Sequence, residues 1–440
     1  MDKILNLGNV TEAIKELKND QNNCVAYIYE NPKQESEGLL SGAVVTIKDV
    51  FATKDAPTQA SSKFLQNFKP SYDATVVERL TKQGAIKVAK VHNDELALGG
   101  TGTFSGFGLI KNPLDASRLA GGSSSGSVAT FTKSISIALG SDTGDSVRLP
   151  ASYNGVVGFK PSYGAIPRYG MFAYASSLDT VAYFAHNVND IAVFSKAVFG
   201  KDIKDMTSVD VKIDNVQNIK PKKVIAFNVF DYLEPYVAQS YQNLIDKLKA
   251  DNVEVELIDL NLDLIRSIKP IYDIVSYSEA SSNLSNLNSI AFGQRENGEN
   301  WSEIMTNSRS KYLGKNVQRR LILGSYYLYQ SNQETMLLKA HKVRRVYKEY
   351  MDNISRSADL VIYPASAAVA AKIDSSLNKS YDFMDYILTG SNLIGTPSLT
   401  MKMGVNDQNL PFNIALDSYI YNDEKLLSHA LYIEKLLEVK

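Results

Sequence analysis

The sequence has few of the residues that identify several common classes of protein. Its 440 residues include one cysteine, Cys24, and four histidines. A single cysteine excludes a disulfide within the chain and a zinc site built from several thiolates, and it is typical of a reducing compartment. No run of apolar residues is long enough to cross a membrane as a helix. These absences favour a cytoplasmic protein, and we expect no metal site in the chain.

The sequence also lacks a large net charge of either sign. Its 47 basic and 48 acidic residues give a formal charge of −1. Such a chain has no overall field to attract the phosphates of a nucleic acid, so any contact with RNA must be local or made by a partner. A hydrophobic content of 44% with 22% charged residues predicts a globular protein with a large core.

The beginning of the chain, MDKILNLGNVTEAIKELKND, is polar and has a helical pattern. It lacks the apolar centre of a signal peptide, so we expect no export and no contact with a membrane. Thr11 is the expected N-cap of this first helix, because a threonine hydroxyl can accept a hydrogen bond from a backbone N–H group two or three residues later.

Strand and helix patterns alternate along the chain, which predicts an α/β fold. An amphipathic helix is expected at residues 73–84, and polar helices from about 300 to 355. Residues 99–170 are rich in glycine and serine, so we expect loops to outnumber regular elements there. The segment 200–350 could form a variable lobe. Strands are expected at residues 43–51, 85–91, 224–230, 253–260 and 359–365, the last of them returning to the first sheet.

Three serines stand between glycines in AGGSSSGS, residues 120–127. Gly121 and Gly126 have the spacing of a phosphate-binding loop, but Ser127 follows where that loop needs a lysine. Residues 122–126 also match the G-x-S-x-G pattern of a nucleophilic serine, which needs a histidine later in the chain. None of the later histidines lies in a segment typical of an active-site loop; they are His186, His341 and His429.

A lysine offers a different way to activate a serine. Lys48 interrupts the apolar segment VVTIKDVF, where its neighbours suggest burial. A desolvated lysine can be neutral near pH 7 and can then act as a base. The alternative is that Lys48 lies at the end of a strand and extends its amine into solvent.

Several motifs in sequence order resemble those of the amidase-signature family, which uses a Ser-Ser-Lys triad. The resemblance covers most of the chain and includes TIKD around Lys48, AGGSSSGS, GSDTGDSVRLPA at residues 140–151, and residues 154–181. It implies that Ser146 is the nucleophile, that Ser123 is a bridging serine preceded by a cis peptide, and that Lys48 is the base. It also implies an oxyanion site made by backbone N–H groups in the turn that contains Thr143, Gly144 and Asp145.

Two residues and one spacing differ from the family pattern. The family usually has glycine where this chain has Ser125 and Asp145, and the interval from Ser123 to Ser146 is one residue shorter than we expect. Aspartate tolerates a positive φ better than most residues, so the turn can form. Its carboxylate would oppose an oxyanion nearby. We therefore expect Asp145 to point away from the substrate.

Within this family, the chain most resembles the glutaminase subunits, called A, of tRNA-dependent amidotransferases. The motifs that indicate this are YDATVV, RYGMFAYASSLD and EASSNL. The resemblance implies that Tyr272, Arg320 and Asp385 bind glutamine, Arg320 by its carboxylate and Asp385 by its ammonium group. From residue chemistry alone, Arg319 and Arg320 could equally be a solvated pair, and Asp385 a surface acid.

The resemblance further implies a division of labour between subunits. The A subunit hydrolyses glutamine and supplies ammonia, while a partner amidates misacylated Glu-tRNA(Gln) or Asp-tRNA(Asn). We therefore expect B and C subunits as partners, tRNA contact mainly through the B subunit, no cofactor in this chain, and ATP with Mg²⁺ on the partner. The alternative is a free-standing amidase of another carboxamide. The implied fold is a single domain over residues 1–440, with one mixed β-sheet covered by helices on both faces.

Overall fold

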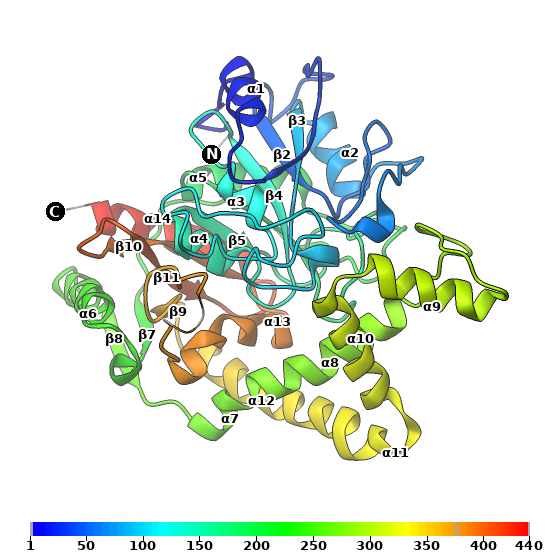
Figure 1. The fold of residues 1–440 in the computed structure, drawn as a ribbon. Helices are drawn as coiled ribbons and strands as arrows, with labels where there is room; N and C mark the ends of the chain where they lie inside the picture. The colour runs from blue at the N-terminus through cyan, green and yellow to red at the C-terminus, as the bar shows by residue number, and fades with distance from the viewer. Residues whose placement is uncertain (1–2, 375, 377, 439–440) are drawn as a thin grey trace.

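The computed structural model describes residues 3–374, 376 and 378–438, and its strands form one sheet (Figure 1). The sheet has eleven strands in the order β1-β3-β2-β4-β6-β5-β10-β11-β9-β7-β8. Strand β2 runs parallel to β3 and β4, and β7 runs parallel to β8 and β9. The other neighbouring pairs are antiparallel. The predicted α/β fold with one mixed sheet is confirmed.

The strands are short in the first half of the chain and longer near its end. Their bounds are β1 Val25–Ile28, β2 Val44–Lys48, β3 Ile86–Val91, β4 Ile137–Asp142, β5 Val157–Lys160, β6 Thr180–Ala185, β7 Lys223–Phe227, β8 Glu254–Ile258, β9 Leu360–Pro364, β10 Ser398–Val405 and β11 Pro411–Asp417. Each of the five strands expected from the sequence is present with shorter bounds. Strand β9 pairs with β7 and β11, so the expected return of the chain to the first sheet is confirmed.

The α-helices differ widely in length. Their bounds are α1 Val10–Lys18, α2 Thr75–Lys82, α3 Ser125–Ala129, α4 Arg148–Asn154, α5 Val188–Val198, α6 Pro235–Ala250, α7 Leu262–Arg266, α8 Ile268–Asn283, α9 Trp301–Tyr312, α10 Lys315–Leu328, α11 Gln330–Asn332, α12 Leu338–Arg356, α13 Gly390–Ile394 and α14 Asp423–Glu438. Short 3-10 turns include η6 Asp382–Asp385. The expected helices at 73–84 and within 300–355 are therefore present.

The first helix begins earlier than its sequence suggested. Its N-cap is Asn9, whose side-chain oxygen accepts a hydrogen bond from the backbone N–H of Glu12 at 3.0 Å. The prediction of Thr11 as the cap is wrong. Asparagine is at least as good an N-cap as threonine, and Asn9 has the extended backbone that a cap requires, whereas Thr11 lies inside the helix.

Helices cover both faces of the sheet because its strands are apolar on both faces. In β4, Ile137 and Leu139 pack into one core, while Ala138 between them packs into the other. This alternation is the normal consequence of side chains pointing to opposite faces of a strand. One core contains residues of α2 and α5, and the other contains residues of α1, α3 and α4.

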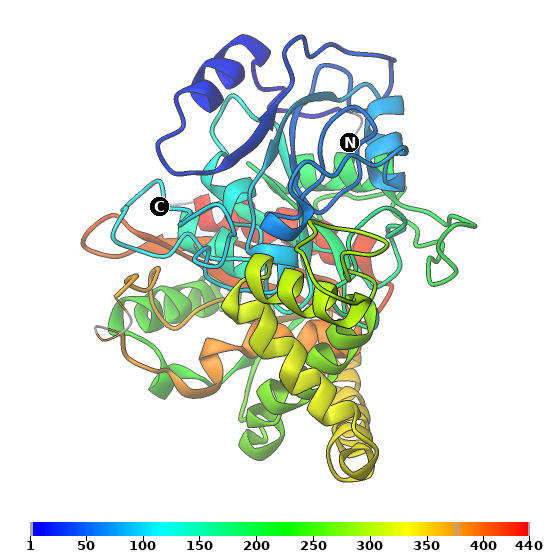
Figure 2. The ribbon, with the colours of Figure 1, turned by 45° about the vertical axis from the view of Figure 1, so that its right-hand side comes forward.

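A group of helices stands against the lower right of the sheet in Figure 1, and Figure 2 brings it forward. In this group α8 packs against both α10 and α12. A Cβ atom at Gly324 of α10 would lie 1.9 Å from the carbonyl oxygen of Tyr277 on α8. Only glycine therefore allows these two helices to approach so closely. The close approach matters because both helices carry residues of the candidate site.

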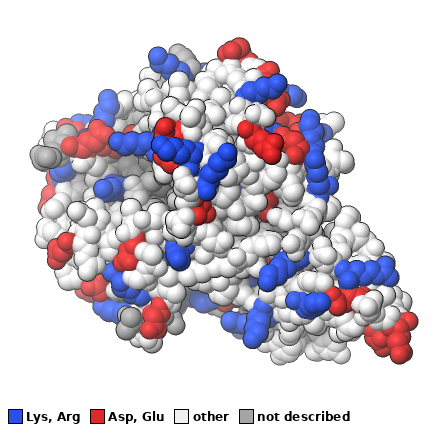
Figure 3. All heavy atoms as spheres, turned by 45° about the horizontal axis from the view of Figure 1, so that its top comes forward, with Lys and Arg blue, Asp and Glu red and all other residues white. Residues whose placement is uncertain are grey.

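The molecular surface carries charged side chains of both signs. On the face drawn in Figure 3, basic and acidic side chains are intermixed. Within the described residues, none of the helices is long and apolar enough to span a bilayer. Trp301 is 67% exposed, so it is not a core residue.

Candidate active site

Lys48 lies at the end of β2, in the interior of the protein. Its exposed fraction is 0%. The Nζ atom lies 2.7 Å from Ser123 Oγ, 3.0 Å from Ser124 Oγ and 2.9 Å from Ser141 Oγ. The alternative in which this amine extends into solvent is therefore wrong, because the strand end is covered by the two serine-bearing loops.

The surroundings of Lys48 favour its neutral form. Burial lowers the pKa of Lys48 to about 7, although the carboxylates of Asp94, Asp142 and Asp179 oppose this effect. An amine that loses its proton near neutral pH has a lone pair available for proton transfer. Lys48 thus has the chemical state that a base requires.

The hydrogen bonds around Lys48 restrict where its lone pair can point. Ser124 donates its hydroxyl hydrogen to the carbonyl oxygen of Ser141 at 3.1 Å. Its oxygen can then only accept a hydrogen from Lys48. A neutral amine has two N–H donors and one lone pair, which leaves one donor and the lone pair for the hydroxyl groups of Ser123 and Ser141. Donation from Ser123 to Lys48 is compatible with this arrangement when Ser141 accepts.

The two serine-bearing loops are joined through their backbones. The peptide between Gly122 and Ser123 is cis, as the resemblance implied. The N–H of Ser124 donates to the carbonyl oxygen of Ser146 at 3.2 Å. Ser146 is 4% exposed, and within the described chain its hydroxyl makes no hydrogen bond. The structure therefore contains the hydrogen bond between Lys48 and Ser123. Proton transfer from Ser146 to Ser123 stays a prediction.

The turn between β4 and α4 presents unused backbone donors. Thr143 donates its hydroxyl hydrogen to Asp179 Oδ1 at 2.7 Å, which holds the start of the turn. In the described part of the chain, the N–H groups of Gly144, Asp145 and Ser146 donate to no protein acceptor. Consecutive free N–H groups next to a nucleophile can stabilise an oxyanion. The proposed oxyanion site has donors available, and its role stays a prediction.

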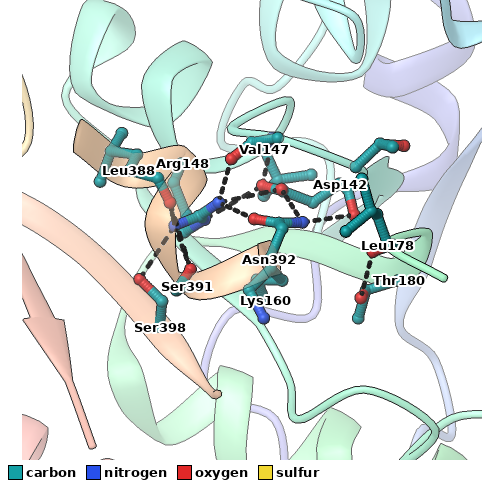
Figure 4. A network of polar contacts seen from close by, with 12 residues as sticks. Asp142, Val147, Arg148, Lys160, Leu178, Thr180, Leu388, Ser391, Asn392 and Ser398 are labelled. Carbon is teal, nitrogen blue, oxygen red and sulfur yellow. Dashed lines mark hydrogen bonds and ion pairs between the residues drawn. The ribbon is translucent and has the colours of Figure 1, made fainter. Parts of the chain in front are cut away.

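Arg148, the first residue of α4, fixes the inner side of this turn (Figure 4). Its side chain is buried and forms an ion pair with Asp142 at 3.0 Å. It donates to the carbonyl oxygen of Gly144 at 2.7 Å and to Asn392 Oδ1 at 2.6 Å. Burial alone would raise the pKa of Asp142, but the charge and hydrogen bonds of Arg148 outweigh it and hold that pKa below its usual value. Further acceptors of this guanidinium group are Leu388, Ser391 and Ser398.

Asp145 is not where we expected it. It lines two adjoining cavities, of about 480 and 790 Å³, that also share Gly100 and Asp385. The expectation that Asp145 points away from the substrate is therefore wrong. The charge of Arg320, which lines the same cavity, acts on the carboxyl group of Asp145, which is consistent with a side chain on the cavity side. Burial raises the pKa of its carboxyl group to about 7, which favours the neutral form.

The smaller cavity brings together the three residues implied to bind substrate. Tyr272 of α8, Arg320 of α10 and Asp385 of η6 all line it, together with Gly144 and Asp145. A Cβ atom on Gly144 would lie 3.1 Å from the ring of Tyr272, so this ring lies directly against the turn. Residues from four separate segments thus form one wall beside Ser146.

Arg320 is held by aromatic side chains and has no carboxylate partner in the described chain. Its Nη1 atom donates to the hydroxyl of Tyr174 at 2.9 Å, and its guanidinium carbon lies 5.2 Å from the ring centre of Tyr277. Although burial alone would lower it, the neighbouring tyrosines raise the pKa of Arg320 above its usual value. Arg320 is half-buried and Arg319 is exposed, so the interpretation of both as a solvated pair is wrong.

Asp385 lines the same cavity as Arg320. Its Oδ2 atom accepts hydrogen bonds from Ser380 Oγ at 3.0 Å and from the N–H of Tyr381 at 3.1 Å. The residue is exposed, yet it lines both cavities. An acid and a base thus stand in one cavity, as a zwitterionic ligand requires.

The histidines have other partners, which removes the serine–histidine alternative. His186 stacks on Phe131 and contacts the carbonyl oxygen of Ile135 at 2.8 Å. His429 contacts the carbonyl oxygen of Ile219 at 3.0 Å. His341 lies on α12 and is exposed. None of these rings contacts Ser123 or Ser146 in the part of the chain that the structure describes.

Sequence reasoning missed three residues that support the site. They are Ser124 and Ser141, which contact Lys48 Nζ, and Arg148, which holds the turn. All three lie inside the two motifs that identified the nucleophile. The sequence did contain a signal for these residues. They are polar residues in motifs that we expected to lie around a buried active site, and a buried polar side chain needs a hydrogen-bond partner. Across residues 3–374, 376 and 378–438, no group of acidic, histidine or cysteine side chains could hold a metal ion.

Comparison with known proteins gives one consistent result. A sequence profile of the family described as amidase matches residues 2–427. The A subunit of glutamyl-tRNA(Gln) amidotransferase from Mycoplasma genitalium is 37% identical over 424 residues, which cover 92% of this chain and 88% of the relative. The protein of the same name from Sulfurisphaera tokodaii is 36% identical over 418 residues, covering 93% of this chain and 87% of the relative.

Solved structures share the fold over nearly the whole chain. The crystal structure of the glutamyl-tRNA(Gln) amidotransferase A subunit from Thermotoga maritima is 29% identical, with a TM-score of 0.79, and covers 97% of this chain and 90% of its own. A bacterial aryl acylamidase of the amidase-signature family is 17% identical, with a TM-score of 0.79, and covers 97% of this chain and 92% of its own. The second likeness concerns the fold alone.

Proposed function

The chain belongs to the amidase family, and on that premise we propose that it is the glutamine-hydrolysing A subunit of a tRNA-dependent amidotransferase. One observation carries this proposal. Lys48 is fully buried, and its Nζ atom lies at hydrogen-bonding distance, 2.7 Å, from Ser123 Oγ, next to a cavity lined by Arg320 and Asp385. The relatives that are named as A subunits of glutamyl-tRNA(Gln) amidotransferases support the same function.

The proposed reaction proceeds through an acyl-serine. Ser146 Oγ attacks the side-chain amide carbon of glutamine and passes its proton through Ser123 to the neutral amine of Lys48. Backbone N–H groups of the turn stabilise the oxyanion of the tetrahedral intermediate. The carbon–nitrogen bond then breaks, and the relay returns the proton to the departing nitrogen, which leaves as ammonia. Water attacks the acyl-serine, which releases glutamate and restores the hydroxyl of Ser146.

The charges of the cavity fit both ends of free glutamine. Arg320 binds the α-carboxylate, for which a guanidinium group offers a planar pair of donors. Asp385 binds the α-ammonium group, and Tyr272 covers the turn beside the reacting amide. A neutral carboxamide would gain less from this cavity, because both charges would lose water without finding an ionic partner.

We also propose the partners that such a protein requires. Ammonia passes to a B subunit, which binds ATP and Mg²⁺ and makes most of the contacts with the tRNA. A C subunit completes the assembly. The misacylated substrate is Glu-tRNA(Gln), Asp-tRNA(Asn) or both. The near-neutral chain is suited to this role, because it need not attract tRNA itself. The protein acts in the cytoplasm, where tRNA is aminoacylated.

A free-standing amidase is the second candidate. The observation in its favour is the cavity of about 790 Å³ that adjoins the smaller one, since together they could hold a carboxamide larger than glutamine. A protein that retains the fold only as a binding scaffold is a weaker candidate, because Lys48 and Ser123 keep a contact that serves proton transfer.

Ammonia release tests the proposal directly. The purified chain, alone and with candidate B and C subunits, is incubated with glutamine and with a neutral aliphatic amide, and ammonia is measured for wild type and Ser146→Ala. We expect glutamine to be preferred and the substitution to abolish release. Ser357→Ala, at the exposed end of α12, is the matched control and should retain full activity. Ammonia release that survives Ser146→Ala contradicts the nucleophile, and preference for the neutral amide favours the second candidate.

A further inference from the structure

Asp145 is an acidic side chain without a protein partner beside the nucleophile. It directly precedes Ser146, lines both cavities, and forms no side-chain hydrogen bond or ion pair with the residues that the structure describes. The reaction proposed above does not use it. A carboxyl group in this position either carries a proton and is neutral or adds a negative charge next to the reacting carbon.

Charged and titratable groups surround Asp145 from several elements. Desolvation raises the pKa of Asp145 to about 7, repulsion from Asp142 adds to this effect, and the positive charges of Arg148 and Arg320 oppose it. We therefore expect the carboxyl group to change its charge near neutral pH. Other titratable and charged groups also line the two cavities. In the smaller cavity they are Lys269, Tyr272, Asp273, Tyr277, Asp382, Asp385 and Tyr386. In the larger cavity they are Arg118, Tyr153, Glu234, Tyr236, Lys372, Lys379, Tyr381 and Asp385.

The backbone of Asp145 would stabilise a negative charge on the reacting oxygen, whereas its ionised side chain would oppose that charge. Its N–H group is one of the free donors of the turn, and it would stabilise the negative oxygen of the tetrahedral intermediate. An ionised carboxylate on the same residue would repel that oxygen, because two negative charges at short range oppose each other. The same residue thus supports the oxyanion when its side chain is neutral and opposes it when its side chain is charged.

We infer that Asp145 sets the alkaline limit of Ser146 reactivity, because only the form with a neutral Asp145 side chain supports attack by Ser146. Lys48 sets the acid limit, since it must be neutral to accept a proton. The two groups together give Ser146 a narrow range of reactivity around neutral pH. This inference rests on the proposed nucleophile but not on glutamine as the substrate.

The test follows the modification of Ser146 by an alkyl fluorophosphonate at pH values from 6 to 9.5. In this reaction Ser146 Oγ forms a bond to phosphorus, the phosphorus–fluorine bond breaks, fluoride leaves, and the proton passes to Lys48. The probe does not titrate in this range, whereas glutamine carries an ionisable ammonium group. We expect the wild-type rate constant to fall above neutral pH, by up to about tenfold per pH unit.

Substitutions separate the carboxyl charge from other causes. Asp145→Asn and Asp145→Gly should remove the alkaline fall and keep the acid limb, so that each reacts at least about tenfold faster than wild type at pH 9. Asp145→Glu should keep the fall. Glu349→Gln is the control for a general loss of negative charge, because Glu349 lines neither cavity and pairs with Arg345 on the exposed side of α12 at 2.6 Å. It should leave the profile unchanged.

The outcomes distinguish this inference from the proposed function. Parallel profiles for wild type, Asp145→Asn and Asp145→Gly would overturn the inference. Labelling that is equal in wild type and Ser146→Ala, or absent in both, would overturn the nucleophile and this inference with it. Normal labelling with the expected profiles but no ammonia from glutamine would support the inference and count against the proposed substrate. Circular dichroism at each pH confirms that the variants remain folded.

Discussion

At the scale of single residues, the same amino acid has different chemistry in different surroundings. Lys48 and Lys160 are both fully buried, and burial lowers the pKa of each to about 7. Among the described residues, Lys160 donates to carbonyl oxygens alone, those of Pro161 and Thr396. Lys48 contacts three hydroxyl groups. A hydroxyl group can give a proton to a neutral amine, whereas a carbonyl oxygen has no proton to give. Of these two lysines, Lys48 is therefore the one suited to act as a base.

Replacing Lys48 by arginine should abolish turnover although the positive charge is kept. Arginine stays protonated at any pH that the protein tolerates, so it cannot accept the proton of Ser123. We expect kcat to fall by about 10²–10⁴-fold. In the wild type, kcat/KM should rise with pH on the acid side of about 7, because the lowered pKa of Lys48 makes the amine neutral as the pH increases. In Asp145→Asn, which lacks the alkaline fall proposed above, this rise should continue to a plateau above pH 7.

The matched control is Lys87→Arg, on the neighbouring strand β3, where Lys87 pairs with Asp55 at 2.6 Å. It should keep wild-type kinetics, since an ion pair accepts either cation. Steady-state ammonia release against pH measures both variants. Full activity of Lys48→Arg would show that a neutral amine at this position is not required.

Arg320 should determine the affinity for glutamine more than the rate of the chemical step. Arg320→Lys keeps the charge but loses the planar pair of donors and the contacts with Tyr174 and Tyr277. Loss of a hydrogen bond to a charged group costs about 1.5–3 kcal/mol, which corresponds to an increase in KM of about 10–150-fold. Labelling of Ser146 by a fluorophosphonate, which has no carboxylate, should change little.

Arg319→Lys is the control, because Arg319 is the adjacent residue on α10 and is exposed. Its KM for glutamine should equal that of the wild type. If both substitutions raise KM alike, the effect belongs to the helix as a whole, and Arg320 does not bind the carboxylate.

At the scale of elements, the turn between β4 and α4 depends on residues far along the chain. Arg148 connects it to Leu388 just before α13, to Ser391 within α13 and to Ser398 at the start of β10. The turn is therefore held by a buried ion pair and by two later elements, and its own sequence is not sufficient to fix it. Removing one ionic partner would leave the other charge buried without compensation.

A double-mutant cycle measures this coupling. Arg148→Met should lower the free energy of unfolding by about 3–5 kcal/mol, because Asp142 stays buried and charged. The double variant Asp142→Asn, Arg148→Met should lose less than the sum of the two single variants. Urea unfolding followed by circular dichroism gives the four free energies.

The exposed pair Arg345–Glu349 on α12, at 2.6 Å with side chains 75% and 60% exposed, is the control for this cycle. Its removal should change the free energy of unfolding by no more than about 1 kcal/mol. Additive effects of Asp142→Asn and Arg148→Met would contradict the coupling.

At the scale of the whole molecule, the site is assembled from distant parts of one sheet and its helices. Lys48 comes from β2, Ser146 from the turn after β4, Tyr272 from α8, Arg320 from α10 and Asp385 from η6. Part of this wall is the group of helices at the lower right of Figure 1. A partner that contacts these helices could therefore change the position of Tyr272 and Arg320 relative to Ser146.

Assembly with partner subunits should accelerate glutamine hydrolysis. We expect the isolated chain to release ammonia slowly and the complex with B and C subunits to release it at least about tenfold faster, since well-positioned groups contribute strongly to rate. The measurement is kcat for ammonia release at saturating glutamine, with and without the partners. A complex that contains Ser146→Ala is the control and should be inactive. Full turnover by the isolated chain would favour a free-standing enzyme.

The sequence by itself was enough to predict the nucleophile, the bridging serine and the base. These residues lie in motifs whose order along the chain is specific to the amidase-signature family. It also determined the α/β class, since strand and helix periodicities are local properties. Its prediction of Thr11 as a cap was wrong, because Asn9 two residues earlier can make the same type of bond.

Only the tertiary structure decided the chemical states and directions of the key side chains. The pKa of Lys48 depends on how completely distant loops exclude water from it, and no local pattern contains that information. The surroundings of Asp145 also come from distant segments, because Arg320 of α10 and Asp385 of η6 line the same cavity. Burial and long-range contact are properties of the folded chain, which is why the position of this carboxyl group was predicted wrongly.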